Sequence, residues 1–182
     1  QAIRELLIEK GVLSAEAIQR QIDDMDSRTP VMGSKIVARA WTDDAYRTRL
    51  LADPKAALAE MGVTKLDENP EVKVVANTPD RHNVIVCTLC SCYPRVVLGM
   101  PPAWYKKRAY RSRVVKEPRQ VLSEFGTEFP DSVKIEVHDS TADLRYLVLP
   151  MRPEGTDGWS PERLAELVTR DVMIGVKVPK AA

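Results

Sequence analysis

The three cysteines of the chain, Cys87, Cys90 and Cys92, all lie within six consecutive positions of its 182 residues. An odd and clustered set of cysteines does not form the disulfide framework of a small secreted protein. In a reducing compartment, such a cluster indicates metal binding or thiol redox chemistry. A Cys-x-x-Cys pair alone is consistent with a redox dithiol or with half of a zinc site. A structural zinc site needs further ligands, and besides the cysteines the chain offers only His82 and His138 as strong nitrogen or sulfur donors.

The Cys90-Ser91-Cys92 end of the cluster narrows the choice of metal. Two cysteines that are separated by one residue hold the backbone between them close to any metal that they share. The amide nitrogens of Ser91 and Cys92 can then bind the metal together with the cysteine sulfurs, including that of Cys87. This donor set favours a low-spin trivalent ion, cobalt(III) or iron(III), over zinc, and it leaves one coordination position open for Lewis-acid catalysis. We therefore predict Cys87, Cys90, Ser91 and Cys92 as the metal ligands.

The motif Cys87-Thr88-Leu89-Cys90-Ser91-Cys92 resembles the metal-binding motif of the nitrile hydratase alpha subunit, a family related to the thiocyanate hydrolase gamma subunit. The resemblance covers nearly the whole chain. The further segments that carry it are residues 9–11, 37–41, 99–105, 110–119, 139–146, 152–159 and 173–176. Thr88 matches the cobalt type of the family, whereas the iron type usually has serine at this position.

The resemblance implies a fold, a reaction and a cofactor. The fold is α+β, with a helical N-terminal arm over residues 1–62 and a layered α-β-β-α domain, metal-binding and catalytic, over residues 63–182. The reaction is hydration of a nitrile to the amide at a low-spin Co(III) centre without corrin or haem, and iron(III) is the less favoured metal. In the family the second cysteine becomes a sulfinic acid and the third a sulfenic acid, here Cys90 and Cys92. The implied partners are a beta-type subunit and a cobalt-delivery or activator protein.

The negative charge of the predicted centre requires cationic neighbours. Three sulfur anions and two amidates around a trivalent ion leave a charge of about −2, which is costly to bury unless it is paired. Arg145 is the first candidate, because it lies in one of the matching segments, and Arg113 and Arg119 are weaker candidates. A surface or core-edge ion pair is the alternative role of Arg145. The Cys92 sulfenate oxygen, or a water activated beside it, is the predicted nucleophile, while His82 and His138 are expected to be structural.

Arg95 departs from the nitrile hydratase pattern, in which tryptophan usually follows three residues after the last cysteine. The thiocyanate hydrolase gamma subunit carries arginine there, in a similar Tyr-Pro-Arg context. An arginine near the metal favours an anionic substrate such as thiocyanate. However, residues 99–102 and 116–119 are closer to the nitrile hydratases. The sequence therefore favours nitrile hydration, with Arg95 as a donor to a polar nitrile, and leaves thiocyanate hydrolysis as the alternative.

The connection between Val63 and Val72 is short for the family. A glutamine that many relatives carry in this region is not evident, and Glu68 and Asn69 stand nearby. A shortened subunit of this kind is consistent with a three-chain assembly.

A metal-storage or metallochaperone module is the hypothesis that does not involve an enzyme. Thiolate-rich sites can serve metal transfer, but transfer favours labile metals. The predicted donor set holds cobalt(III) almost inertly, which disfavours this role.

Composition excludes several other classes of function. The formal net charge is +1, so no bulk field recruits nucleic acid or a membrane surface. No apolar run approaches the roughly 20 residues of a membrane-spanning helix. The first residues lack the apolar segment of a secretory signal, so we expect a cytoplasmic protein.

Hydrophobic periodicity and turn residues predict the order of elements. Helices are expected over residues 1–25 with an interruption near Gly11, 33–40, 43–61 with a restart at Pro54, 104–110, 117–125 and 160–170. Short β-branched segments predict strands over residues 72–76, 84–87, 133–137 and 145–148, and a last strand or extended segment over 172–178. Ser14 and Ser160 are the expected N-caps.

Overall fold

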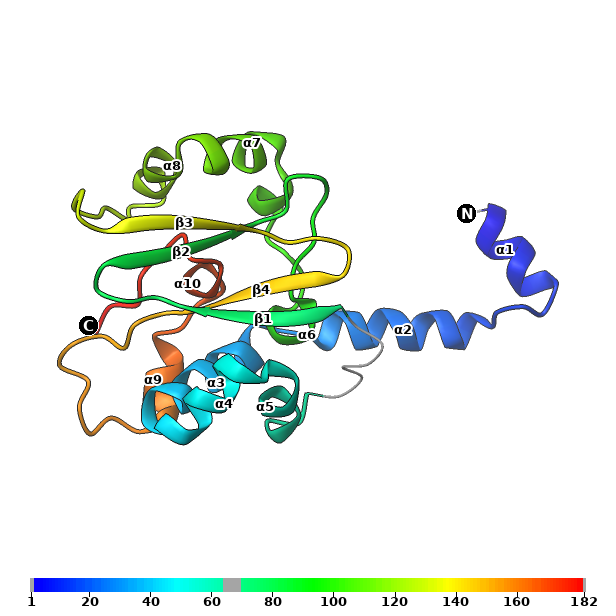
Figure 1. Ribbon diagram of the computed structural model, residues 1–182. Coiled ribbons are helices and arrows are strands. Elements are labelled where there is room, and N and C mark those ends of the chain that lie inside the picture. The colour runs from blue at the N-terminus through cyan, green and yellow to red at the C-terminus, as the bar shows by residue number, and fades with distance from the viewer. Residues whose placement is uncertain (1, 64–69, 182) are drawn as a thin grey trace.

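The structure, a computed structural model shown in Figure 1, describes residues 2–63 and 70–181. Glu68 and Asn69, in the short connection before the first strand, lie outside the described residues. The helices are α1 (Ala2–Glu9), α2 (Ala15–Ser27), α3 (Val31–Thr42), α4 (Asp44–Ala52), α5 (Pro54–Glu60), α6 (Arg95–Leu98), a 3-10 helix (Ala103–Lys106), α7 (Arg108–Lys116), α8 (Pro118–Glu124), α9 (Pro161–Glu166) and α10 (Arg170–Ile174). The strands are β1 (Glu71–Ala76), β2 (Arg81–Val86), β3 (Lys134–Asp139) and β4 (Leu144–Leu149).

Most helices begin where the sequence predicts them, because caps and prolines stand at their first positions. Ser14 and Ser160 cap α2 and α9 by accepting a hydrogen bond from the backbone N–H three residues further on. Pro54 and Pro118 stand in the first turns of α5 and α8, where a missing N–H costs no helical hydrogen bond. The helix expected over residues 104–110 is divided into the 3-10 helix and α7, because Lys107 between them has extended backbone angles.

The strands in the described residues form two parallel pairs, β1 with β4 and β2 with β3. β2 also contacts β4, so the two pairs lie side by side. The three residues Val84, Ile85 and Val86 at the end of β2 are all fully buried. In the register of the second pair, Val86 lies opposite Asp139, the last residue of β3. This register brings Asp139 next to the segment that follows β2, which is the cysteine motif.

The strands lie between two groups of helices, with α7 and α8 on one side and α3, α4, α5 and α9 on the other (Figure 1). One hydrophobic core joins them, including Ile36 and Val37 of α3, Ile85 of β2 and Leu122 of α8, each no more than 1% exposed. The predicted α+β class is confirmed by this arrangement. No helix in the described part of the chain is both long and apolar enough to cross a membrane.

The first two helices differ from the next three in their burial. α1 and α2 contain no buried residue, and Figure 1 shows them extending away from the body of the molecule. α3, α4 and α5 contribute buried side chains to the core that the strands share. The division into an arm over residues 1–62 and a domain over residues 63–182 stays a prediction.

The strand or extended segment predicted over residues 172–178 is wrong, because its first half is the helix α10. Thr169 caps α10 by accepting from the Val172 N–H, and Gly175 ends it with a φ of +91°. A Cβ at Gly175 would lie 2.0 Å from the Asn83 carbonyl oxygen, so only glycine fits this approach to β2. Val172 and Ile174 are fully or almost fully buried, and an apolar run that is buried on all sides does not distinguish a helix from a strand by periodicity.

A closed polar network lies at the start of β2. His82 Nε2 lies 2.7 Å from the Gly175 carbonyl oxygen, which can only accept, so His82 donates there and its Nδ1 accepts from the Asn77 amide at 3.0 Å. The Asn77 side-chain oxygen in turn accepts from the Asn83 backbone and side chain, at 2.8 and 2.9 Å. His138 Nε2 lies 2.8 Å from the Asn83 side-chain oxygen. Both histidines are therefore engaged with asparagines, as expected for structural residues.

Candidate metal centre

The cysteine motif forms the loop that follows β2, and its three sulfurs face one another. The Cys90 sulfur lies 3.4 Å from that of Cys87 and 3.1 Å from that of Cys92. All three sulfurs lie within 4.8 Å of one another, and no other cluster of metal-ligating side chains of this kind occurs in residues 2–63 and 70–181. Cys87 is buried, Cys92 is half-buried and Cys90 is exposed. Three thiolates this close repel one another unless a cation lies between them, so the donor set fits a thiophilic metal ion.

Asp139 fixes the first half of the loop from the end of β3. Its carboxylate accepts from the backbone N–H of Thr88 at 2.9 Å and from the Thr88 hydroxyl at 2.5 Å. The parallel register opposite Val86 is what places Asp139 within reach. Hydrogen bonds to a charged carboxylate are short and strong, so Thr88 holds the loop through its side chain as well as its backbone.

Two side chains from the segment after the motif hold loop carbonyl groups. The Tyr105 hydroxyl donates to the Cys92 carbonyl oxygen at 2.9 Å. Arg111 on α7 donates from Nη1 to the carbonyl oxygens of Thr88, at 3.3 Å, and Cys90, at 3.1 Å. The neighbouring Tyr110 donates to the Ile85 carbonyl oxygen at 2.7 Å and so attaches α7 to β2. The loop therefore keeps its shape through residues that lie far from it in the sequence.

The thiols of the loop differ in acidity. Hydrogen bonds from Cys92 and Cys87 to the Cys90 sulfur lower the pKa of Cys90 to about 7. Burial, and the hydrogen bond that Cys92 gives to Cys90, raise the pKa of Cys92 to about 12, while the positive charge of Arg145 opposes this rise. The pKa values of the exposed Cys90 and the half-buried Cys92 are therefore shifted in opposite directions.

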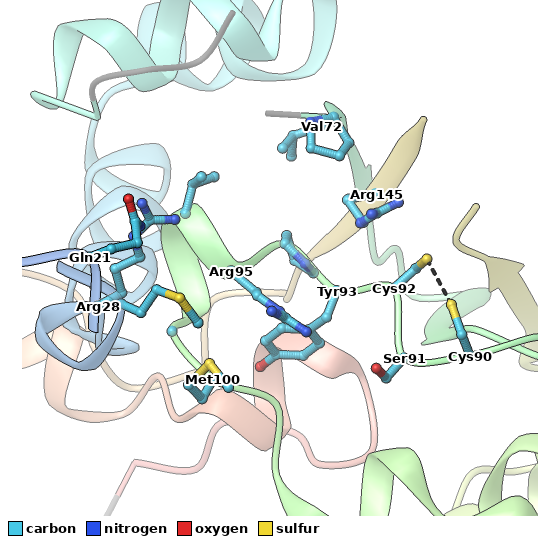
Figure 2. A pocket seen from close by; sticks show the side chains of 15 residues that line it. Gln21, Arg28, Val72, Cys90, Ser91, Cys92, Tyr93, Arg95, Met100 and Arg145 are labelled. Atoms are coloured by element: carbon cyan, nitrogen blue, oxygen red, sulfur yellow. Dashed lines mark hydrogen bonds between the residues drawn. The ribbon is translucent and has the colours of Figure 1, made fainter. Parts of the chain in front are cut away.

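A cavity of about 480 Å³ opens beside the sulfurs and is rich in arginine. Figure 2 shows Arg145 on the side nearest Cys92, and Arg28 with Gln21 on the opposite side. Arg95, the first residue of α6, also lines the cavity. No carboxylate is among the lining residues in the described part of the chain, so the cavity presents a positive wall to the exposed sulfurs.

Gly99 joins this cavity to α2. The residue ends α6 with a φ of +67°, and a Cβ there would lie 2.1 Å from the Arg28 carbonyl oxygen. Any side chain at Gly99 would therefore push the backbone after α2 away from α6. The absence of a side chain lets α2 form one wall of the cavity.

The predicted residues are placed in different surroundings. Arg145, Arg95, Ser91 and Cys92 all line the cavity, together with Cys90. The weaker candidates have other partners: Arg113 pairs with the carboxylates of Glu117 and Glu124, and Arg119 donates to carbonyl oxygens of residues 129–133. His82 and His138 bond to asparagines rather than to the cysteines.

Sequence reasoning missed Asp139, Tyr105 and Arg111, the three side chains that hold the loop. Tyr105 lies 13 residues after its acceptor Cys92, and Arg111 lies 21 residues after its acceptor Cys90. Asp139 lies 51 residues after Thr88, whose backbone and side chain donate to it. Their only signal in the sequence was membership of the segments that match the family.

Comparisons with known proteins agree with the site. A family model described as nitrile hydratase, alpha chain, matches residues 1–177. The cobalt-containing nitrile hydratase subunit alpha of Pseudonocardia thermophila is 50% identical over 182 residues, which cover 99% of this chain and 89% of that subunit. The thiocyanate hydrolase subunit gamma of Thiobacillus thioparus is 46% identical over 189 residues, covering 98% of this chain and 78% of that subunit.

The backbone agrees as closely as the sequence. The solved structure of a double mutant of Fe-type nitrile hydratase from Comamonas testosteroni Ni1 has a TM-score of 0.92 and 41% sequence identity, covering 99% of this chain and 88% of that one. The family match, the sequence identities and the three-sulfur loop all support the same family assignment. This chain belongs to the nitrile hydratase alpha-chain family.

Proposed function

We propose that the chain is the metal-binding alpha-type subunit of a nitrile hydratase and hydrates a nitrile to the amide at a low-spin Co(III) centre. The observation that carries the proposal is the gathering of three sulfurs within 4.8 Å of one another beside an arginine-lined cavity. A cobalt-containing relative at 50% identity supports it. The three cysteines would then hold the metal beside the cavity that receives the substrate.

The ligands in this proposal are the sulfurs of Cys87, Cys90 and Cys92 and the backbone nitrogens of Ser91 and Cys92. Thr88 and the cobalt-containing relatives favour cobalt, while the Fe-type structural neighbour makes iron(III) the second choice. When bound, the trivalent ion supplies a Lewis acid that withdraws electron density from the nitrile. We infer that Cys90 is oxidised to the sulfinic acid and Cys92 to the sulfenic acid, with Cys87 left as the thiolate.

The residues of the chain have separate tasks in this reaction. The Cys92 sulfenate oxygen would add to the nitrile carbon as one C–N π bond opens, and water would then release the amide and restore the sulfenate. In the alternative, the sulfenate would position the water that adds to the nitrile carbon. Arg145, whose charge acts on Cys92, compensates the anionic sulfurs and holds the sulfenate in place. Arg95 donates hydrogen bonds from the cavity wall to the remote part of the substrate. Asp139, Tyr105 and Arg111 keep the loop rigid, so that the attacking atom is already oriented.

The same proposal includes partners and a compartment. A beta-type subunit covers the exposed Cys90 and packs on α1 and α2, which bury no residue within the chain. The relationship to thiocyanate hydrolase makes a three-chain assembly the alternative to a two-chain one. A cobalt-delivery or activator protein loads the metal, and the assembly works in the cytoplasm on a small-molecule nitrile.

Thiocyanate hydrolysis to carbonyl sulfide and ammonia is the second candidate function, and Arg95 is the observation that favours it. A guanidinium on the wall of a cavity without carboxylates attracts an anion. Nitrile hydration ranks first because the identity to the cobalt-containing nitrile hydratase subunit, 50%, exceeds the 46% to the thiocyanate hydrolase subunit.

A paired assay on the cobalt-loaded assembly tests the proposal. Amide formation from a nitrile and carbonyl sulfide release from thiocyanate are measured side by side, for the natural chain and for Arg95→Trp. We expect amide formation to dominate in both, and Arg95→Trp to lower any carbonyl sulfide release by about 10- to 100-fold, the value of one charge-assisted hydrogen bond. Intact-mass measurement counts the oxygens on the cysteines. The proposal is overturned if neither amide formation nor carbonyl sulfide release is detected and the three cysteines are unmodified.

A further inference from the structure

We propose that Arg111 is a positioning residue for the metal centre and supports the binding of the Ser91 backbone nitrogen through the Cys90 carbonyl group. The inference rests on the proposed metal centre but not on which substrate it converts. Arg111 does not line the cavity, so its role is separate from those of Arg95 and Arg145.

Arg111 contacts two carbonyl groups of the loop, and one of them belongs to a peptide group whose nitrogen is a proposed metal ligand. Its Nη1 lies 3.1 Å from the Cys90 carbonyl oxygen and 3.3 Å from the Thr88 carbonyl oxygen. The Cys90 oxygen and the Ser91 nitrogen belong to the same peptide unit, in which resonance shares electrons over oxygen, carbon and nitrogen. Negative charge that the Ser91 nitrogen carries as a metal ligand is therefore partly located on the Cys90 oxygen, where Arg111 donates its hydrogen bond.

The positive charge of Arg111 has no other compensation in the described part of the chain. None of the ion pairs among these residues includes Arg111, and its Nε is buried without a hydrogen-bond partner. Burying part of a guanidinium without an anion is unfavourable. A loop that carries negative backbone charge in its metal-bound form would supply the missing anion.

The helix that carries Arg111 is firmly attached. Tyr110, the preceding residue, is only 7% exposed and donates to the Ile85 carbonyl oxygen on β2 at 2.7 Å. The strand that leads into Cys87 and the helix that carries Arg111 are thus joined directly. This attachment fixes the backbone of Arg111 relative to the loop, and the two hydrogen bonds to the loop carbonyl groups hold its guanidinium.

Cobalt retention in three Arg111 variants tests the inference. In the cobalt-loaded assembly, Arg111→Met removes charge and donors, Arg111→Gln keeps a donor without charge, and Arg111→Lys keeps the charge. Arg108→Met is the matched control, since Arg108 is an exposed residue of the same helix. The readouts are the rate of cobalt loss to a chelator, the sulfur-to-cobalt absorption band, and the unfolding temperature of the metal-free assembly.

We expect Arg111→Met and Arg111→Gln to lose cobalt about 10- to 100-fold faster than the natural chain, the usual effect of removing a residue that supports metal ligands. Arg111→Lys should recover most of the difference, and the absorption band should shift only in the variants without charge. Equal cobalt loss from Arg111→Met and Arg108→Met would overturn the inference. So would equal cobalt loss from Arg111→Gln and Arg111→Lys, a comparison that remains if Arg111→Met does not fold. Neither result depends on nitrile turnover.

Discussion

The two ends of strand β2 carry contrasting polar groups. At its start, His82, Asn77 and Asn83 form a network in which donors and acceptors are matched within the chain. At its end, Cys87, Cys90 and Cys92 place three sulfurs together that compete for protons and leave Cys90 exposed.

The contrast separates a structural site from a reactive one. Neutral side chains with complete hydrogen bonding add rigidity and have little reactivity left. Like-charged ligands held together by the fold store unfavourable energy that a bound cation relieves. Histidine is a common metal ligand, yet in this chain its two copies belong to the matched network, and the reactive end is built from sulfur.

Replacement of the Cys92 sulfur should have the largest effect on the cysteine loop at the end of β2. Cys92→Ser removes the predicted nucleophile, so nitrile hydration should fall on the order of 10⁴-fold or more, the range for a residue that acts on the reacting atoms. Turnover is measured as amide formation, normalised to the cobalt content of each preparation. Substantial activity in a fully cobalt-loaded variant would remove Cys92 from its assigned role.

Asp139, at the end of β3, holds the cysteine loop through Thr88, and its replacement should affect the metal centre less than the replacement of Cys92. Asp139→Asn keeps the shape but loses the charge that holds Thr88. Cobalt should be lost to a chelator about 10- to 100-fold faster. Glu136→Gln on the same strand is the control, because its partners are Lys134 and Arg81 rather than the loop. Cobalt retention that is equal in the two variants would contradict the importance of this contact.

The polar network of His82, Asn77 and Asn83 at the start of β2 should make the stability of the chain depend on pH rather than on bound metal. This effect should be the smallest of the three. Burial lowers the pKa of His82 below its ordinary value of 6.5, although the hydrogen bond to Gly175 opposes this change. As pH drops below 6.5, His82 binds a proton in the unfolded chain more readily than in the folded chain. The free energy of unfolding therefore falls in this pH range. At pH 5.5 the loss from His82 reaches at most about 1.4 kcal/mol.

Urea unfolding of the metal-free chain at pH 7.5 and 5.5 measures this loss. His82→Gln should weaken the dependence on pH, because the titrating group is gone. An unchanged difference between the two pH values in this variant would assign the acid sensitivity to other residues, of which His138 is the first, since burial lowers its pKa as well.

The parts of the site that the sequence predicts are those that local chemistry determines. Cys87, Cys90 and Cys92 were identified because their spacing in the chain is short enough to dictate their spacing in space. The same holds for helix starts such as Ser14, whose side chain accepts from the nearby Ala17 N–H, and Pro54, which stands in the first turn of α5.

Contacts that depend on strand register could not be predicted in this way. Asp139 reaches Thr88 only because β3 pairs in parallel with β2, with Val86 opposite Asp139. Arg111 reaches Cys90 only because α7 packs on the end of the same strand. The prediction of a strand or extended segment over residues 172–178 fails at α10 for a related reason. The apolar residues of α10 are buried by tertiary neighbours, which removes the periodic signal of a helix.

The close approach of Gly99 to the Arg28 backbone attaches the C-terminal end of α2 to the metal cavity, and this contact is the point about which α2 could pivot. α2 has 13 residues, so at 1.5 Å per residue its far end lies about 20 Å from this pivot. A tilt of α2 about this contact would move Gln21 about half as far as Ala15, and Arg28 hardly at all. Gln21 and Arg28 both line the cavity, so a given tilt would displace the cavity wall less than it displaces the far end of the helix.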